Sequence, residues 1–149
     1  MCCIRHRYDT AGFTILEVVA VLLLMGVLAS VAIPRVMDAG YAVTAEAEVL
    51  RANLRFAQSV ALAANTAQWS IHFAGNTYTL QRNGATSSVR FPGQSSATHV
   101  LGNGVQVTGG TGTLVFNTFG APALTYVITL SNAARTESVV VTGFTGLVP

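Results

Sequence analysis

The side chains suited to acid–base or metal chemistry are few and widely spaced in this sequence. His72 falls in an alternating stretch and His99 in one rich in Ser, Thr and Gly, while Asp38 is distant from both. A catalytic triad needs a histidine oriented by a nearby carboxylate, and a zinc site needs about three or four ligands. We therefore expect no catalytic residues, no metal site, no cofactor and no enzymatic activity.

A single carboxylate, Glu17, interrupts an apolar stretch at residues 13–33. A helix of that length spans roughly 30 Å, the thickness of a membrane's hydrocarbon core, where a carboxylate costs on the order of a few kcal/mol. Arg5 and Arg7, with Ser-Val-Ala at residues 30–32, fit a cleaved secretory signal, although the apolar run is longer than is usual there. A plain membrane anchor leaves the carboxylate unexplained.

A third interpretation accounts for the carboxylate. Residues 12–17, Gly-Phe-Thr-Ile-Leu-Glu, resemble the processing motif of type IV prepilins. The resemblance implies that a prepilin peptidase and methyltransferase cleaves between Gly12 and Phe13 and N-methylates Phe13. In an assembled filament Glu17 would then pair with the amine of a neighbouring Phe13, because both charges are costly when buried alone. Pro34 matches the proline at which the family's helix bends or melts locally.

The chain divides by composition into four segments. These are a leader (1–12), a transmembrane and assembly helix (13–35), an amphipathic helix (36–64) and a β-rich head (65–149). The expected fold class is α+β and pilin-like. A long N-terminal membrane-spanning helix continues into an amphipathic helix packed on an antiparallel head. The expected location is the bacterial inner membrane, crossed once, with the head in the periplasm or on a filament.

Hydrophobic periodicity predicts the elements of the head. Apolar residues at spacings of three and four predict a helix over residues 44–64. After Trp69 the period becomes two, and Gly75-Asn76 predicts a hairpin. Further strands are expected at Val89–Phe91, Val105–Val107, Thr113–Phe116, Leu124–Leu130 and Glu137–Thr142. We expect residues 83–104, rich in Ser, Thr, Gly and Asn, to form a long loop.

Three stretches resemble the GspH/FimT-type minor pseudopilins, a group that includes related minor pilins such as those of MSHA type. They are the helix at residues 50–61 with the strand after it, the Phe-x-x-x-Gly-x-Pro turn at 116–122, and the terminal strand at 139–146. The family commonly has Arg near the first and third stretches, where this sequence has Gln58 and Phe144. The resemblance implies a minor structural subunit of a type II secretion pseudopilus or type IV pilus.

The charge and cysteine content of the chain limit the kinds of partner that it is expected to bind. Cys2 and Cys3 are the only cysteines and Glu137 is the only acidic residue after Glu48, so a disulfide-closed or calcium-binding head is not expected. The chain has no Lys and its Arg residues are scattered, which argues against DNA as a partner. The expected partners are the processing enzyme, other pilin or pseudopilin subunits, and inner-membrane lipid.

The alternative function is a tip-exposed module that captures DNA, a secreted substrate or a surface. Convergence of Arg82, Arg90 and Arg135 on one face of the head would favour that alternative.

Overall fold

The computed structural model describes residues 14–64 and 66–149, without the side chains of residues 30–39. The chain divides into two compact units, Met1–Arg35 and Val36–Pro149. The elements are α1 (Ile15–Ala63), β1 (Trp69–Ala74), β2 (Thr77–Arg82), β3 (Ala85–Thr86), β4 (Thr98–Val100), β5 (Gln106–Gly109), β6 (Gly112–Phe116), β7 (Tyr126–Ser131) and β8 (Thr136–Val141).

The expected membrane-spanning helix is not found. Within residues 14–64 and 66–149, no helix is both long enough and apolar enough to cross a membrane. The prediction of a transmembrane helix over 13–35, and with it that of a single-pass inner-membrane protein, is therefore wrong.

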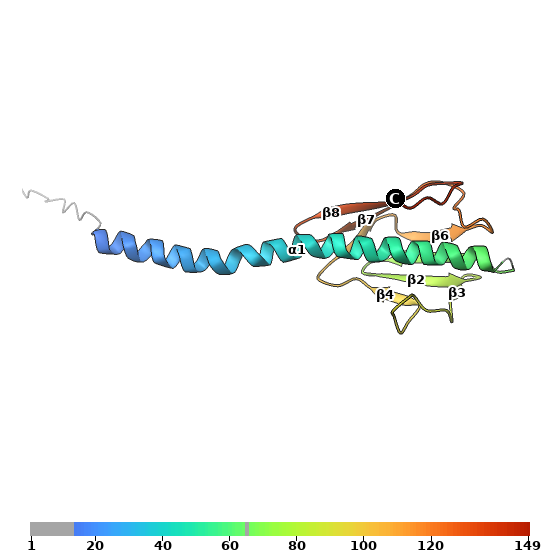
Figure 1. Cartoon of the computed structure of the whole chain (residues 1–149), viewed down its shortest axis with the longest axis horizontal. Helices are drawn as coiled ribbons and strands as arrows, with labels where there is room; N and C mark the ends of the chain where they lie inside the picture. The colour runs from blue at the N-terminus through green and yellow to red at the C-terminus, as the bar shows by residue number, and fades with distance from the viewer. Residues whose placement is uncertain (1–13, 65) are drawn as a thin grey trace, which may run out of the picture. The chain divides into compact units, whose positions relative to one another are not determined.

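The head carries two antiparallel sheets. Sheet A has the order β3-β2-β1-β6, with β4 also paired to β2, and sheet B has the order β5-β7-β8. In unit 2 the helix lies over both sheets, with β6, β7 and β8 above it and β2, β3 and β4 below it in the view of Figure 1. The α+β class with a β-rich antiparallel head is therefore confirmed.

The chain passes from one sheet to the other at Gly110. Just before it β5 pairs with β7, and just after it β6 pairs with β1. Gly110 has φ +71°, and a Cβ there would lie 2.2 Å from the Val127 carbonyl oxygen. Only glycine fits this corner, because a side chain would collide with the backbone of β7.

One hydrophobic core joins the helix to both sheets. Its helical part is an apolar stripe at spacings of three and four, made by Val43, Ala47, Leu50, Leu54, Ala57 and Ala61. Alternate residues of the strands face this stripe, among them Ile71 and Leu80 in sheet A and Ile128 and Val139 in sheet B. The core therefore forms where the apolar face of a helix, with its 3.6-residue period, packs on the apolar faces of strands, with their two-residue period.

Most of the predicted elements of the head are present, with one exception. The hairpin at Gly75-Asn76 is confirmed, because Ala74 pairs with Thr77 across it. No strand forms at Val89–Phe91. The ring of Phe91 is instead buried, 5.5 Å from that of Tyr78. The stretch expected as a loop also contains the short strands β3 and β4.

Candidate functional site

The first described residues begin the helix with a local cap. The amide of Glu17 lies 3.3 Å from the Thr14 hydroxyl, as in an N-terminal capping pair of Thr and Glu three residues apart. The Glu17 side chain is exposed, and no ion pair joins it to another described residue. Gly12 and Phe13 lie outside the described residues, and the bend at Pro34 stays a prediction. Thr14 therefore caps the helix through its hydroxyl, and the pairing of the Glu17 carboxylate stays a prediction.

The helix that follows is apolar on every side and exposed on every side. Its large apolar side chains have exposed fractions between 48% and 85%; they are Ile15, Leu16, Val18, Val19, Val21, Leu22, Leu23, Leu24, Met25, Val27 and Leu28. A helix that is hydrophobic all round is normally buried by other chains or by a larger core. Half of the exposed large apolar residues in the described part of the chain lie in this segment.

In the head, the three stretches singled out in the sequence meet at Gln58. Its Nε2 donates to the carbonyl of Gly120 at 3.0 Å and also to the carbonyl of Gly146. Gly146 has φ +69°, and a Cβ there would lie 2.6 Å from the Gly120 carbonyl oxygen. The helix, the turn at 116–122 and the terminal loop are thus held together by one amide group.

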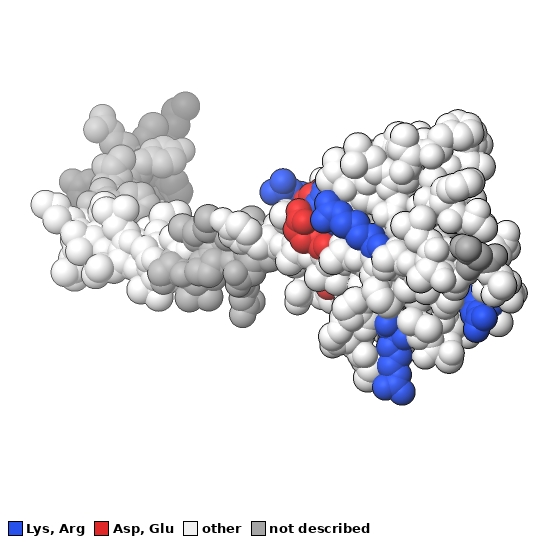
Figure 2. All heavy atoms as spheres, turned by 45° about the vertical axis from the view of Figure 1, so that its right-hand side comes forward, with Lys and Arg blue, Asp and Glu red and all other residues white. Residues whose placement is uncertain are grey.

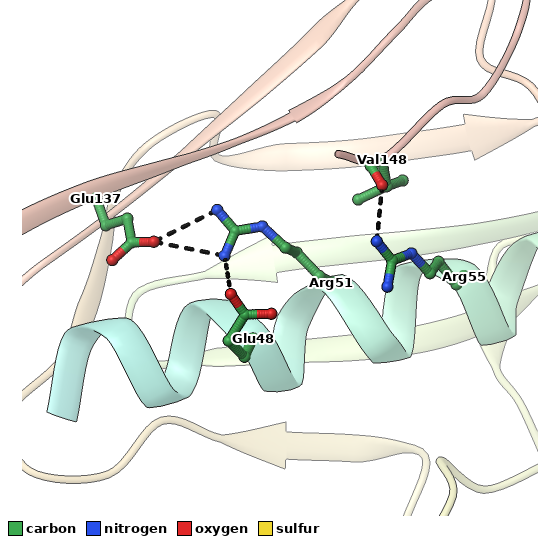
Figure 3. A network of polar contacts seen from close by, with 5 residues as sticks. All are labelled: Glu48, Arg51, Arg55, Glu137 and Val148. Carbon is green, nitrogen blue, oxygen red and sulfur yellow. Dashed lines mark hydrogen bonds and ion pairs between the residues drawn. The ribbon is translucent and has the colours of Figure 1, made fainter. Parts of the chain in front are cut away.

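Two arginines extend this connection along α1 (Figure 3). Arg55 donates to the carbonyl of Val148 at 3.0 Å. Arg51 contacts Glu48 on the helix at 2.8 Å and Glu137 on β8 at 3.3 Å. The pair between Arg51 and Glu137 is largely shielded from water, so it contributes more to orientation than an exposed pair does.

Exposed apolar side chains surround the Gln58 connection. Phe119 and Phe144 are 80% and 81% exposed, and Leu62 and Leu147 are also exposed. The backbone links them, because the amide of Phe144 donates to the Pro122 carbonyl at 2.9 Å. Such a surface suits contact with protein and offers nothing to a phosphate group.

One histidine contact was not foreseen from the sequence. His99 Nε2 lies 2.9 Å from Glu46 Oε2, and its Nδ1 lies 2.9 Å from Gln94 Nε2. When Gln94 donates to Nδ1, the ring proton sits on Nε2 and is donated to Glu46. The other oxygen of Glu46 accepts from the amide of Gly102 at 2.9 Å, so the pair ties α1 to β4 and the loop after it.

The other histidine also makes a structural contact. His72 is half-buried on β1, where its Nδ1 lies 2.9 Å from the Thr113 hydroxyl. Among the described residues, no group of three or more His, Cys, Asp or Glu side chains is placed to hold a metal.

Tyr78 is the most strongly perturbed titratable group of the head. Its ring is fully buried, and its hydroxyl accepts a hydrogen bond from Asn53 Nδ2 at 2.8 Å. Burial raises the pKa of Tyr78 well above its usual range, although the Asn53 bond works in the opposite direction. Burial also raises the pKa of Tyr126, whose hydroxyl donates to the Gly110 carbonyl at 3.0 Å.

Arg82 and Arg135 lie in different sheets of the head. Arg82 stacks 5.8 Å from the centre of the Trp69 ring in sheet A, whereas Arg135 lies in the turn between β7 and β8 of sheet B. On the face seen in Figure 2, basic side chains appear at separate places, and acidic ones lie beside one group of them. This arrangement does not favour a phosphate-binding surface.

Comparison with protein-family models, with curated proteins and with solved structures finds no match to this chain.

The contacts of Gln58 and the contact between Glu46 and His99 differ in how far they can be predicted from the sequence. The Gln58 connection joins stretches that sequence resemblance had picked out, but nothing in the sequence pairs Gln58 with two glycine carbonyls. Glu46 and His99 are separated by 53 positions. Only the pairing of β4 with β2 brings that strand beside the helix.

Proposed function

We propose that this chain is a pilin-like structural subunit that enters a filament through its exposed apolar helix. The filament is a type II secretion pseudopilus or a type IV pilus, and the chain is a minor subunit acting in assembly or at the tip. Before assembly, a prepilin peptidase cleaves between Gly12 and Phe13, and Phe13 is N-methylated.

One observation carries the proposal most directly. Residues 15–29 form a helix whose apolar side chains are exposed all round. Hydrophobic stabilisation requires that such a surface be covered, and parallel helices of neighbouring subunits would cover it on all sides. Glu17 is the one charged side chain in this stretch, so its charge must be paired when the helix is covered.

The head supports the same proposal. It presents an exposed apolar surface around Phe119 and Phe144 and no cluster of metal ligands among the described residues. These features suit a protein that acts by contact with other proteins.

The test compares incorporation of the full chain when it is co-expressed with other pilin-like subunits. Glu17→Ala and Glu17→Gln should each lower co-purification about tenfold or more, since the amine of Phe13 would be buried without its partner. Glu48→Gln is the matched control, because Glu48 is an exposed carboxylate later in the same helix. Undiminished co-purification of both Glu17 variants would contradict the pairing.

A second arm tests the processing step on the same material. Gly12→Val should leave the leader attached, and intact-mass spectrometry should then show the uncleaved chain. A wild-type N-terminus at Val31 or Ile33 in place of Phe13 would contradict the proposal.

A further inference from the structure

Strand β6 has one paired edge and one free edge. It pairs with β1, where Leu114 lies opposite Ile71, and with no other described strand. The Gln68 carbonyl accepts from the Asn83 amide at 2.8 Å, so the main-chain groups of Gln68 and of every second residue after it face β2. Ile71 belongs to the other alternate set of β1, so its main-chain groups face β6 and pair with those of Leu114. The residues on either side of Leu114 therefore direct their main-chain groups away from β1.

The outward groups belong to Thr113 and Val115. No hydrogen bond joins the amide or carbonyl of either residue to another described residue. These groups repeat every second residue, at about 6.7 Å along the strand, which is the repeat that another extended strand offers. A free edge of this kind is a template for pairing with a further strand.

A hollow of about 180 Å³ opens beside this edge. One wall is β6, and the other is the segment from Pro122 to Tyr126 that leads into β7. The hollow forms where the two sheets part, because the chain leaves sheet B at Gly110 and continues in sheet A as β6. It has no charged side chain in its lining, and Leu124 on its rim is 75% exposed.

We propose that this groove binds a short, uncharged segment of a partner polypeptide, which adds to sheet A as an extended strand along β6. The unpaired main-chain groups select an extended backbone, and the uncharged lining selects apolar or β-branched side chains. Neighbouring strands lie about 4.8 Å apart, so a strand along β6 can pair its main-chain groups with those of the edge, whereas a helix keeps its main-chain groups paired internally. The lack of charge in the lining likewise disfavours nucleic acid and phosphate.

This inference concerns the head alone and stands whether or not the chain enters a filament. The probe is the labelled peptide acetyl-Thr-Val-Thr-Val-Thr-amide, added to the full chain in detergent. Its control is the same peptide with alternate amides N-methylated, which cannot pair with an edge. Fluorescence anisotropy measures binding, and hydrogen exchange followed by NMR reports on the amides of Thr113 and Val115.

We expect saturable binding, with exchange at Thr113 and Val115 slowed about tenfold or more and no binding of the N-methylated peptide. Leu124→Arg places a charge at the rim of the groove and should weaken binding about tenfold or more. Val100→Arg, at a valine on β4 that is 60% exposed and outside the lining, should change binding less than about twofold.

Three results would overturn the proposal. The first is no saturable binding at millimolar peptide, and the second is equal binding by the wild type and Leu124→Arg. The third is self-association of the full chain that Leu124→Arg abolishes, because the occupant would then be a second copy of this chain.

Discussion

Two stretches of the same helix, residues 15–29 and 42–61, are surrounded very differently. In the second, a stripe that includes Val43, Leu50 and Leu54 is completely buried against the sheets. In the first, apolar residues occupy all sides and none of the described side chains is buried. Helical geometry is common to both, so the pattern of side chains makes the difference. One apolar stripe matches one sheet surface, whereas an apolar surface all round needs neighbours on every side.

The small residues of the second stretch refine this comparison. Ala47 precedes Leu50 and Leu54 along the buried stripe, and Ala57 and Ala61 follow them. Small side chains let the sheet backbone approach the helix closely, while leucines fill the remaining space. The first stretch instead carries large apolar side chains around its whole circumference, which suits packing among several helices.

The largest expected effect comes from removing the first stretch of the helix, residues 15–29, while keeping the second. Removal of residues 1–35 should leave the head of residues 36–149 folded and monomeric, while the full chain associates through its exposed helix. Circular dichroism should show mixed helix and sheet, and light scattering after size exclusion should give a monomer mass. A disordered spectrum, or continued association of the shortened chain, would remove the distinction between the two regions.

A matched pair of substitutions sharpens the same comparison. Leu54→Ala should lower the free energy of unfolding of the head by about 2–5 kcal/mol, because it leaves a cavity at a fully buried site. Leu23→Ala, at a leucine that is 67% exposed, should change it by less than about 0.5 kcal/mol. Urea unfolding of the full chain in detergent measures both values. Similar losses for the two variants would contradict the assignment of the core.

The smallest expected effect concerns pH and tests how α1 covers Tyr78. Because burial raises the pKa of Tyr78, above about pH 10 the unfolded chain loses a proton that the folded head retains. Stability should therefore fall as pH rises above 10, by up to about 1.4 kcal/mol per pH unit for this group. Tyr126, with its pKa also raised by burial, contributes with the same sign.

Tyr78→Phe should make this decline shallower in thermal melts between pH 9 and pH 12. Tyr41→Phe is the control, because Tyr41 lies on α1 with its side chain 67% exposed. An unchanged slope in Tyr78→Phe would show that α1 does not shield the hydroxyl of Tyr78.

Much of the head could be predicted from local pattern. The apolar spacing over residues 44–64 places a helix that ends at Ala63, and the alternation after Trp69 places β1. The failure at Val89–Phe91 has a physical cause. Val89 and Phe91 both favour a strand, but burial of the Phe91 ring among aromatic neighbours outweighs β-propensity in a segment that short.

By itself, the sequence determined the features that depend on near neighbours, namely the helix, the hairpin and the stripe that would be buried. Tertiary structure alone decided that Gln58 meets Gly120 and Gly146, that Glu46 meets His99, and that the sheets part beside β6. It also overturned the expected membrane span. The physical reason is the distance along the sequence over which each interaction acts. Propensity and periodicity act over a few residues, whereas these contacts follow from strand order and register, which bring distant segments together only when the whole core packs.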